Sequence, residues 1–364
     1  MSEKRLLIIF GASGNLSQYK LLPVILNDKL YKDGKIVLFS RHPPCEKLVE
    51  KIKLESNNQL QIEVNDYSDT TRVLEILEGH DNPAIYLALP SKIHIYIMKT
   101  LDSLNIKMSI YVEKPHFMSA EEVKIAQNFK NLSMFLIDHF LLKKTLILWK
   151  CLPKKFRENL INIDEIENIR AAATETISAE NRISFDLDGI LRDMIISHLF
   201  ALYKTVLPNG NLETLKVKKE VLKGQYENYE FKGSQTPTLS YIILESEKNF
   251  DVELFAGKSL SKKTTFFDIK MKSGTLSLQF APETDILFNG KSVIDKQTYE
   301  SYFKEFHSLE GYNLLLYSII HRKTIPTFPI ESLLYGYKVE NDLKNLNTEM
   351  IVYKKGVDIF EQMK

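Results

Sequence analysis

Two ionisable side chains, Asp193 and His198, stand in a segment of the chain that is otherwise apolar. Residues 190–202 have the composition of a helix that is buried nearly all round. A single histidine on such a helix is commonly a hydrogen-bonded core residue, but two ionisable groups on one buried helix favour a functional site. Because an ordinary histidine pKa lies near 6.5, His198 is suited to accept a proton near neutral pH.

A second group of polar residues follows an apolar run at 134–137. Asp138 comes where that run ends, and a carboxylate at this place can hold a histidine in one tautomer and stabilise its charged form. His139 and Lys143 are four residues apart and share a face if a helix begins there. With Lys263 they could surround a phosphate dianion with positive charge, although a single lysine more commonly faces solvent.

A glycine pair follows the first apolar run, in the order Gly11, Ala12, Ser13, Gly14, Asn15, Leu16. Glycines at the turn from a strand into a helix let the backbone approach a pyrophosphate, which the N–H groups of the helix start can bind. The G-x-x-G spacing alone also fits an ordinary tight turn. After the second run, Ser40 and Arg41 stand where an acidic residue would hold a ribose hydroxyl. Arginine at that place can pair with a 2′-phosphate, which favours NADP over NAD, although a solvated arginine after a strand fits this residue equally well.

Glu113, Lys114 and Pro115 follow another strand-like run. The proline restrains Lys114 to an extended backbone, which directs its side chain toward the edge of the sheet.

The first 140 residues must therefore build a sheet that brings these groups to one edge. Apolar runs alternate with segments of helical spacing, which indicates a doubly wound parallel sheet covered on both faces. The runs are 6–10, 36–39, 84–89, 109–112 and 134–137. The sequence predicts a Rossmann-like domain over residues 1–144.

After about residue 145 the pattern changes to charged helical segments and a helix from about 187 to 206. Successive strand-like stretches follow at 239–244, 266–271 and 276–280, and further helices from about 299 close the chain. Strands in succession indicate a mostly antiparallel sheet. We predict an α+β domain over residues 145–364.

Composition excludes several classes of function. The 48 basic and 47 acidic residues give a net charge of +1, without a basic stripe for nucleic acid or an acidic tail. The only two cysteines, Cys45 and Cys151, exclude a disulfide framework and favour a reducing compartment. No apolar run approaches the roughly 20 residues that span a membrane, and the start does not read as a signal peptide. We expect a cytoplasmic protein that binds neither nucleic acid nor membrane.

Several of these motifs together resemble the glucose-6-phosphate dehydrogenase family. The glycine turn, the Glu-Lys-Pro run and the run Asp-His-Phe-Leu-Leu-Lys at 138–143 occur in the family's order. The second domain adds a likeness to the family's substrate helix at 185–198, and to two later motifs at 221–226 and 256–263. The matches extend from residue 8 to about 263, and faintly to about 340. Six or seven motifs in order are hard to obtain by chance.

The resemblance implies oxidation of the C1 hydroxyl of glucose 6-phosphate, or a related hexose phosphate, to 6-phosphogluconolactone, with NADP as hydride acceptor in the pentose phosphate pathway. It implies that His198 is the general base and that Asp138 orients it. It also implies a cis peptide bond between Lys114 and Pro115. Substrate contacts are implied for Lys114, His139, Lys143, Glu175, Asp193, Lys258 and Lys263. Cofactor contacts are implied for Gly11, Ala12, Ser13, Gly14, Asn15, Leu16, Lys20, Ser40, Arg41, Leu89 and Lys114. By the same analogy, the second domain carries a homodimer interface. No metal site is expected.

The chain also departs from the family's pattern at several positions. The differences are Asn15 for an aspartate, His94 for an aromatic residue, Leu142 for a glycine, Thr174 for a lysine, Ser197 for an asparagine and Ala281 for a glutamine. The stretch between Glu175 and Asp186 is short, as is the whole chain. The sugar-hydroxyl contacts are altered more than the proton-transfer pair, so the particular sugar phosphate stays open.

Two alternatives compete with this interpretation. Oxidoreductases of the Gfo/Idh/MocA type share the Glu-Lys-Pro motif, but the run at 138–143 and the motifs at 221–226 and 256–263 argue against them. A catalytically silent relative that acts as a binding or regulatory module should have lost its base, yet Asp138 and His198 remain.

Overall fold

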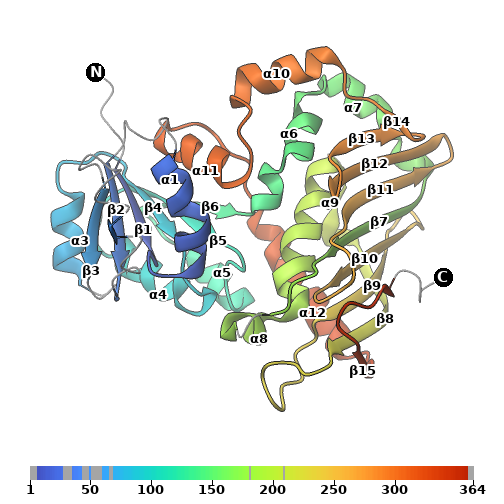
Figure 1. The fold of residues 1–364 in the computed structure, drawn as a ribbon, viewed down its shortest axis with the longest axis horizontal. Helices are drawn as coiled ribbons and strands as arrows, with labels where there is room; N and C mark the ends of the chain where they lie inside the picture. The colour runs from blue at the N-terminus through green and yellow to red at the C-terminus, as the bar shows by residue number, and fades with distance from the viewer. Residues whose placement is uncertain are drawn as a thin grey trace. The chain divides into compact units, whose positions relative to one another are not determined.

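The computed structural model describes residues 6–27, 35–42, 49–50, 60–64, 69–179, 182–207 and 210–359. The chain forms two compact units (Figure 1). The first comprises Met1–Leu142 and Leu309–Phe328, and the second comprises Lys143–Ser308 and Pro329–Lys364. The segment 309–328 therefore belongs with the first unit, although it lies well beyond the boundary expected near residue 144.

The first unit contains a six-stranded sheet in the order β3-β2-β1-β4-β5-β6, with every neighbouring pair parallel. The strands are β1 (Leu6–Phe10), β2 (Lys35–Ser40), β3 (Leu60–Val64), β4 (Ala84–Leu87), β5 (Met108–Glu113) and β6 (Leu132–Ile137). This confirms the predicted doubly wound sheet. The sequence prediction had missed β3, an edge strand in which Gln61 and Glu63 interrupt the apolar pattern.

The helices of the first unit connect these strands. They are η1 (Ser17–Leu21), α1 (Leu22–Asn27), α3 (Thr70–Leu77), α4 (Ser91–Asp102), α5 (Ala120–Ala126), the 3₁₀ turn η3 (His139–Leu142) and α11 (Gly311–Ile320). Asp69 caps α3 by accepting a hydrogen bond from the Arg72 N–H, and Ser119 caps α5 in the same way from Glu122. The apolar helix α11 packs against β1 and η3, which explains why residues 309–328 join this unit.

The second unit contains a nine-stranded sheet in the order β14-β13-β12-β11-β7-β10-β9-β8-β15. The strands are β7 (Ile166–Thr174), β8 (Lys216–Tyr226), β9 (Leu239–Glu245), β10 (Asp251–Gly257), β11 (Thr265–Met271), β12 (Gly274–Ala281), β13 (Asp285–Phe288), β14 (Lys291–Ser292) and β15 (Met350–Tyr353). Among the strands that the structure describes in this sheet, only the pairs β7–β10 and β8–β15 are parallel, so the sheet is mostly antiparallel, as predicted.

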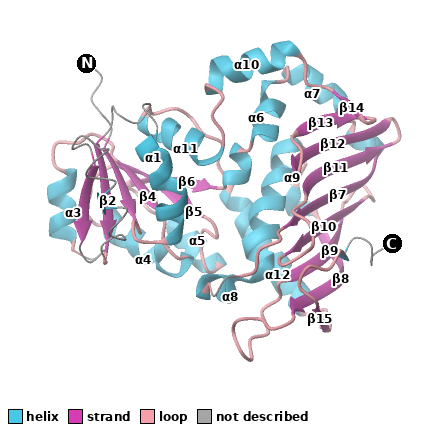
Figure 2. Cartoon of the chain, viewed as in Figure 1, coloured by secondary structure: helices cyan, strands magenta, loops and turns pink. Residues whose placement is uncertain are grey.

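Helices pack against this sheet, and Figure 2 shows α6, α9 and α12 on the same face of it. The helices are α6 (Lys144–Cys151), α7 (Lys154–Leu160), η4 (Ile163–Glu165), α8 (Ile183–Ile190), η5 (Leu191–Leu199), α9 (Phe200–Val206), η6 (Leu212–Thr214), α10 (Lys296–Phe306) and α12 (Ile330–Lys344). None of the described helices is long and apolar enough to cross a membrane. Cys151 has a free thiol, and Cys45 lies outside the described residues.

Candidate active site

The glycine turn after β1 is held between the ends of two neighbouring strands. The N–H groups of Gly11 and Ala12 donate to Phe39 O at 2.9 and 3.3 Å, at the end of β2. Gly11 has φ +89°, and a Cβ built on it would lie 2.3 Å from Ala88 O, just beyond β4. Both the positive φ and the close approach of Ala88 O therefore require glycine at this position.

The helix that follows this turn is not a regular α-helix. Its residues Ser17–Leu21 form the π-helical turn η1, which comes just before Pro23 in α1. A proline inside a helix has no N–H to donate, and wider turns are a common way to accommodate that loss. Lys20, one of the predicted cofactor residues, is exposed on this turn.

The predicted nucleotide residues lie at the carboxyl ends of adjacent strands. Ser40 is buried at the end of β2 and its hydroxyl donates to His42 O at 2.5 Å, while Arg41 beside it is exposed. Leu89 follows β4 and is half-buried. Because β2, β1 and β4 are neighbours in the sheet, Arg41 and Leu89 flank the glycine turn. This is the place where sheets of this order bind dinucleotides.

Lys114 follows β5 and is held by a buried acid. The Lys114–Pro115 bond is cis, as predicted. The Lys114 N–H donates to Glu113 Oε2 at 3.2 Å, and the Tyr86 hydroxyl donates to Glu113 Oε1. Burial raises the pKa of Glu113 to about 7, against the opposing effect of the Tyr86 hydrogen bond. The Tyr312 hydroxyl, from α11, also contacts Glu113 and has its own pKa raised by burial.

Asp138 and His139 follow β6 at the same edge of this sheet. Asp138 is 1% exposed, and its Oδ1 accepts a hydrogen bond from the Phe140 N–H at 2.8 Å. The His139 ring stacks on Tyr312 with centroids 5.7 Å apart. A buried carboxylate and a histidine therefore stand at the carboxyl end of the strand, as the sequence predicted.

In the second unit, the predicted helix over 187–206 consists of three pieces with a kink at Gly189, whose φ is 65°. The middle piece, η5, is a nine-residue π-helix that contains both Asp193 and His198. Residues five apart diverge by about 140° around an α-helix, whereas i to i+5 bonding brings them nearly onto one face. The Ser197 hydroxyl also bonds Asp193 O at 2.8 Å. The π-helix therefore places the two ionisable side chains on one face of a buried helix.

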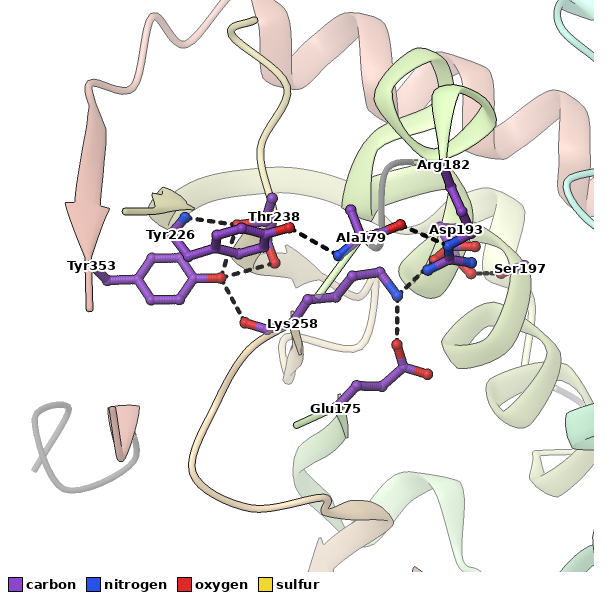
Figure 3. Close-up of polar contacts among 9 residues, drawn as sticks. All are labelled: Glu175, Ala179, Arg182, Asp193, Ser197, Tyr226, Thr238, Lys258 and Tyr353. Carbon is purple, nitrogen blue, oxygen red and sulfur yellow. Dashed lines mark hydrogen bonds and ion pairs between the residues drawn. The ribbon is translucent and has the colours of Figure 1, made fainter. Parts of the chain in front are cut away.

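Lys258, Glu175 and Asp193 meet in the second unit (Figure 3). The Lys258 ammonium lies 2.5 Å from Glu175 Oε2 and 3.1 Å from Asp193 Oδ2, and the Phe185 ring centroid is 5.0 Å away. Lys258 is 1% exposed, whereas the Glu175 side chain is 27% exposed. The structure thus brings together three of the predicted substrate residues, and Glu175 gives the cluster an opening to solvent.

The parallel strands β7 and β10 explain how Glu175 and Lys258 meet. Thr174 ends β7 opposite Gly257, which ends β10, so the next residue of each strand emerges at the same edge. The Thr174 hydroxyl binds Lys262 O at 2.8 Å and accepts the Thr264 N–H at 2.8 Å, which fastens the following loop. This is a structural role for a residue at which the chain differs from the family's pattern.

The lysines predicted to bind phosphate are arranged differently from the helical expectation. His139–Leu142 is a 3₁₀ turn, and Lys143 is an extended residue with ψ 146° that caps α6. The expectation that His139 and Lys143 share one helical face is therefore wrong, because the chain changes direction at Lys143. The Lys143 ammonium lies 5.9 Å from the Phe280 ring, near the end of β12. Lys263 is exposed just before β11, the partner strand of β12.

Several residues of these clusters were missed from the sequence. Tyr86 and Tyr312 bind Glu113, yet Tyr86 lies in an apolar run that reads as core and Tyr312 stands about 200 residues away in the chain. Phe185 covers Lys258 and lies about 70 residues before it in the chain. The only available signal was an acid, Glu113, at the end of a buried strand, because such a group needs partners.

The sheet of the first unit with its glycine turn, together with the large mixed sheet of the second, defines the fold of two-domain dehydrogenases. A solved glucose-6-phosphate dehydrogenase in complex with glucose-6-phosphate matches with a TM-score of 0.76 at 18% identity, covering 99% of this chain and 98% of that one. A scyllo-inositol dehydrogenase from Lactobacillus casei matches with a TM-score of 0.64 at 16% identity, covering 95% and 97%. No family model matches the chain.

Sequence comparison finds more specific similarities. A glucose-6-phosphate 1-dehydrogenase of Buchnera aphidicola subsp. Schizaphis graminum is 25% identical over 414 residues, which cover 98% of this chain and 84% of that protein. The enzyme of the same name from Encephalitozoon cuniculi is 26% identical over 303 residues, covering 71% and 65%. Over most of its length, the chain is therefore similar in sequence to enzymes named glucose-6-phosphate 1-dehydrogenase.

Proposed function

We propose that the chain oxidises the C1 hydroxyl of glucose 6-phosphate, or a closely related hexose phosphate, to 6-phosphogluconolactone. The hydride leaves C1, and the hydroxyl proton passes to the imidazole of His198. The relatives named glucose-6-phosphate 1-dehydrogenase support the reaction type. The observation that carries the proposal in this chain is the Glu175–Asp193–Lys258 cluster, built partly on the π-helix that carries His198.

The charge of that cluster favours recognition of sugar hydroxyls. Lys258 is already paired with two carboxylates, so its positive charge is compensated. Carboxylates accept hydrogen bonds from hydroxyl groups, and the part-exposed Glu175 is the accessible one. We assign the phosphate group instead to His139, Lys143 and Lys263, whose side chains are less buried.

NADP fits the carboxyl edge of the first sheet. The glycine turn follows β1 at the carboxyl edge, which is where sheets of this strand order bind a pyrophosphate. The exposed Arg41 suits a 2′-phosphate, and Lys114 suits the region between sugar and nicotinamide. When bound, NADP supplies the hydride acceptor. The contribution of the chain is to hold and orient it through residues 11–16, Lys20, Ser40–Arg41 and Leu89.

His198 and Asp138 belong to different units, and their pairing is part of the proposal. A neutral imidazole takes the hydroxyl proton while hydride leaves, and a carboxylate on its other nitrogen stabilises the imidazolium that results. His198 is 1% exposed and Asp138 also 1%, so each charge depends on a protein partner.

We also propose that residues 1–144 provide nucleotide binding and residues 145–364 provide sugar binding and a homodimer interface, in a cytoplasmic protein. Sedimentation equilibrium tests the dimer directly. A mass that stays at that of one chain across a wide concentration range would exclude the dimer.

The deciding experiment is NADPH formation measured over a panel of hexose phosphates and the matching free hexoses. We expect turnover with glucose 6-phosphate, weaker turnover with other hexose 6-phosphates and little with free sugars. Binding of a sugar phosphate without turnover would identify a silent relative. Turnover of free sugars in preference to the sugar phosphates would favour an oxidoreductase of the Gfo/Idh/MocA type.

A further inference from the structure

Two buried histidines connect the loops at the carboxyl edge of the first sheet. His94 lies in the first turn of α4 and is 0% exposed, and His116 follows Lys114–Pro115 and is 1% exposed. His94 contacts the loop after β4 and the loop after β5, and His116 contacts the end of β6. These three strands are neighbours in the sheet (Figure 1), so the two rings form a chain across its edge.

The hydrogen-bond count of the two rings differs. His116 Nε2 lies 3.0 Å from Ile137 O, and within the described residues its Nδ1 has no hydrogen-bond partner. One N–H therefore satisfies His116, which suits a neutral imidazole. Burial lowers the pKa of His116 to about 4, in agreement with a neutral ring. Its ring also stacks on Phe328, with centroids 5.8 Å apart.

The two hydrogen-bond partners of His94 each require a donor from its ring. Its Nδ1 lies 2.7 Å from His116 O and its Nε2 lies 2.8 Å from Leu89 O. Both partners are main-chain carbonyls, which only accept hydrogen bonds, and a neutral imidazole has a single N–H. A neutral ring can therefore hold one loop and must face the other with a lone pair. Only the imidazolium donates to both carbonyls.

We propose that His94 is a titratable positioning residue: its protonated ring joins the loops after β4 and β5, and so favours dinucleotide binding as the pH falls. The proposal rests on the proposed function, because Leu89 and Lys114 on these loops are assigned to the cofactor. Neutral His94 leaves one loop unbound. Ordering that loop then reduces the net binding free energy of the dinucleotide.

The surroundings of His94 act both for and against protonation of its ring. Burial lowers the pKa of His94, and the two carbonyls oppose that effect. On the loop after β5, a charge on His94 lowers the pKa of His116, as does Lys114, while Asp138 at the end of β6 raises it. On α4 itself, Lys92 and Lys99 are exposed, and on α5 Glu122 accepts the Met118 N–H. The N-terminal end of α4 also disfavours a cation.

The first test reads the ring itself. In the full chain with ¹⁵N-labelled histidine, the His94 signals are assigned by their loss in His94→Phe, and spectra are followed from about pH 5 to about pH 8.5. We expect two protonated ring nitrogens at the acid end and one at the alkaline end. A His94 ring that carries one proton throughout overturns the proposal.

The second test reads the loops through NADPH binding, followed by nucleotide fluorescence at about pH 5.5 and about pH 8. After the pH dependence measured for His94→Phe is subtracted, the wild type should bind NADPH about tenfold tighter at the lower pH. His94→Phe should bind weakly and lose this dependence. His94→Gln, whose amide donates but does not titrate, should recover affinity without recovering the dependence.

His321→Gln serves as the matched control, since His321 is an exposed histidine of the same unit. It should keep the pH dependence of the wild type. The same pH dependence in wild type and His94→Phe overturns the proposal. If the wild type binds no nucleotide at either pH, the proposed function fails, and the ring spectrum alone decides the state of His94.

Discussion

The ammonium of Lys258 lies 3.1 Å from the carboxylate of Asp193, in a part of the second unit where Lys258 is 1% exposed. The pair joins the end of β10 to the π-helix η5, two elements far apart in sequence. Glu175 completes the cluster at 2.5 Å from the same ammonium. The cluster therefore matters for the stability of the unit as well as for any ligand.

Removing the ammonium should destabilise the protein. Lys258→Met leaves two carboxylates close together without a counter-charge, and breaking a buried pair in this way costs about 3–5 kcal/mol. We expect the free energy of unfolding in urea to fall by about that amount. Lys262→Met is the control, since Lys262 is 72% exposed and pairs with Asp358 at the surface. The control should lose no more than about 1 kcal/mol, and equal losses would contradict the buried pair.

His198→Asn should remove the proposed base while changing little volume. We expect the rate of NADPH formation in a single turnover to fall by about 10²- to 10⁴-fold, the usual contribution of a general base. Binding of glucose 6-phosphate, measured by calorimetry, should stay near that of the wild type. Turnover near normal would exclude His198 as the base.

Arg41→Ala should weaken NADP far more than NAD. The guanidinium is exposed beside the glycine turn, and a charged hydrogen bond to a 2′-phosphate is worth a tenfold to hundredfold change, about 1.5–3 kcal/mol. The two dissociation constants are measured by nucleotide fluorescence. An equal loss for both nucleotides would remove the basis for NADP preference.

Glu113 should make the stability of the protein depend on pH. Burial raises its pKa from 4.5 to about 7, so folding favours the protonated acid. Its contribution to stability is therefore complete below about pH 4.5 and is lost as the pH rises through 7. Glu113→Gln cannot lose a proton. Its unfolding free energy relative to that of the wild type should therefore increase by about 3 kcal/mol as the pH rises across that range.

The control for that measurement is Glu121→Gln, because Glu121 is an exposed acid of the same unit. Its stability curve should run parallel to that of the wild type. A Glu113→Gln curve that also runs parallel would mean that Glu113 titrates normally.

The parts of the fold that depend on local pattern were predictable. Strands β1, β4 and β5 are covered on both faces and read as continuous apolar runs, and the glycine turn follows β1 where the helix must start. Strand β7 was missed although it lies in the middle of the second sheet. Its residues Glu167 and Arg170 are exposed, and its inner face is largely alanine, so no apolar run marks it.

The remaining features depend on contacts between distant segments. The sequence around His198 has the apolar composition of an ordinary helix, and nothing in it distinguishes π from α bonding. Residues 309–328 join the first unit because α11 packs on β1 and η3, a contact across most of the chain. The site residues themselves were predicted largely by family resemblance. Their partners, such as Tyr312 at Glu113, depend on that packing and could not be predicted.

The parallel pairing of β7 with β10 has a consequence for how this protein tolerates change in length. Glu175 and Lys258 are 83 residues apart, yet one strand register places them side by side. Insertions or deletions in the exposed turns between those strands leave the register intact, and therefore leave the two side chains in place. The outer loops of this sheet can therefore shorten repeatedly without separating Glu175 from Lys258.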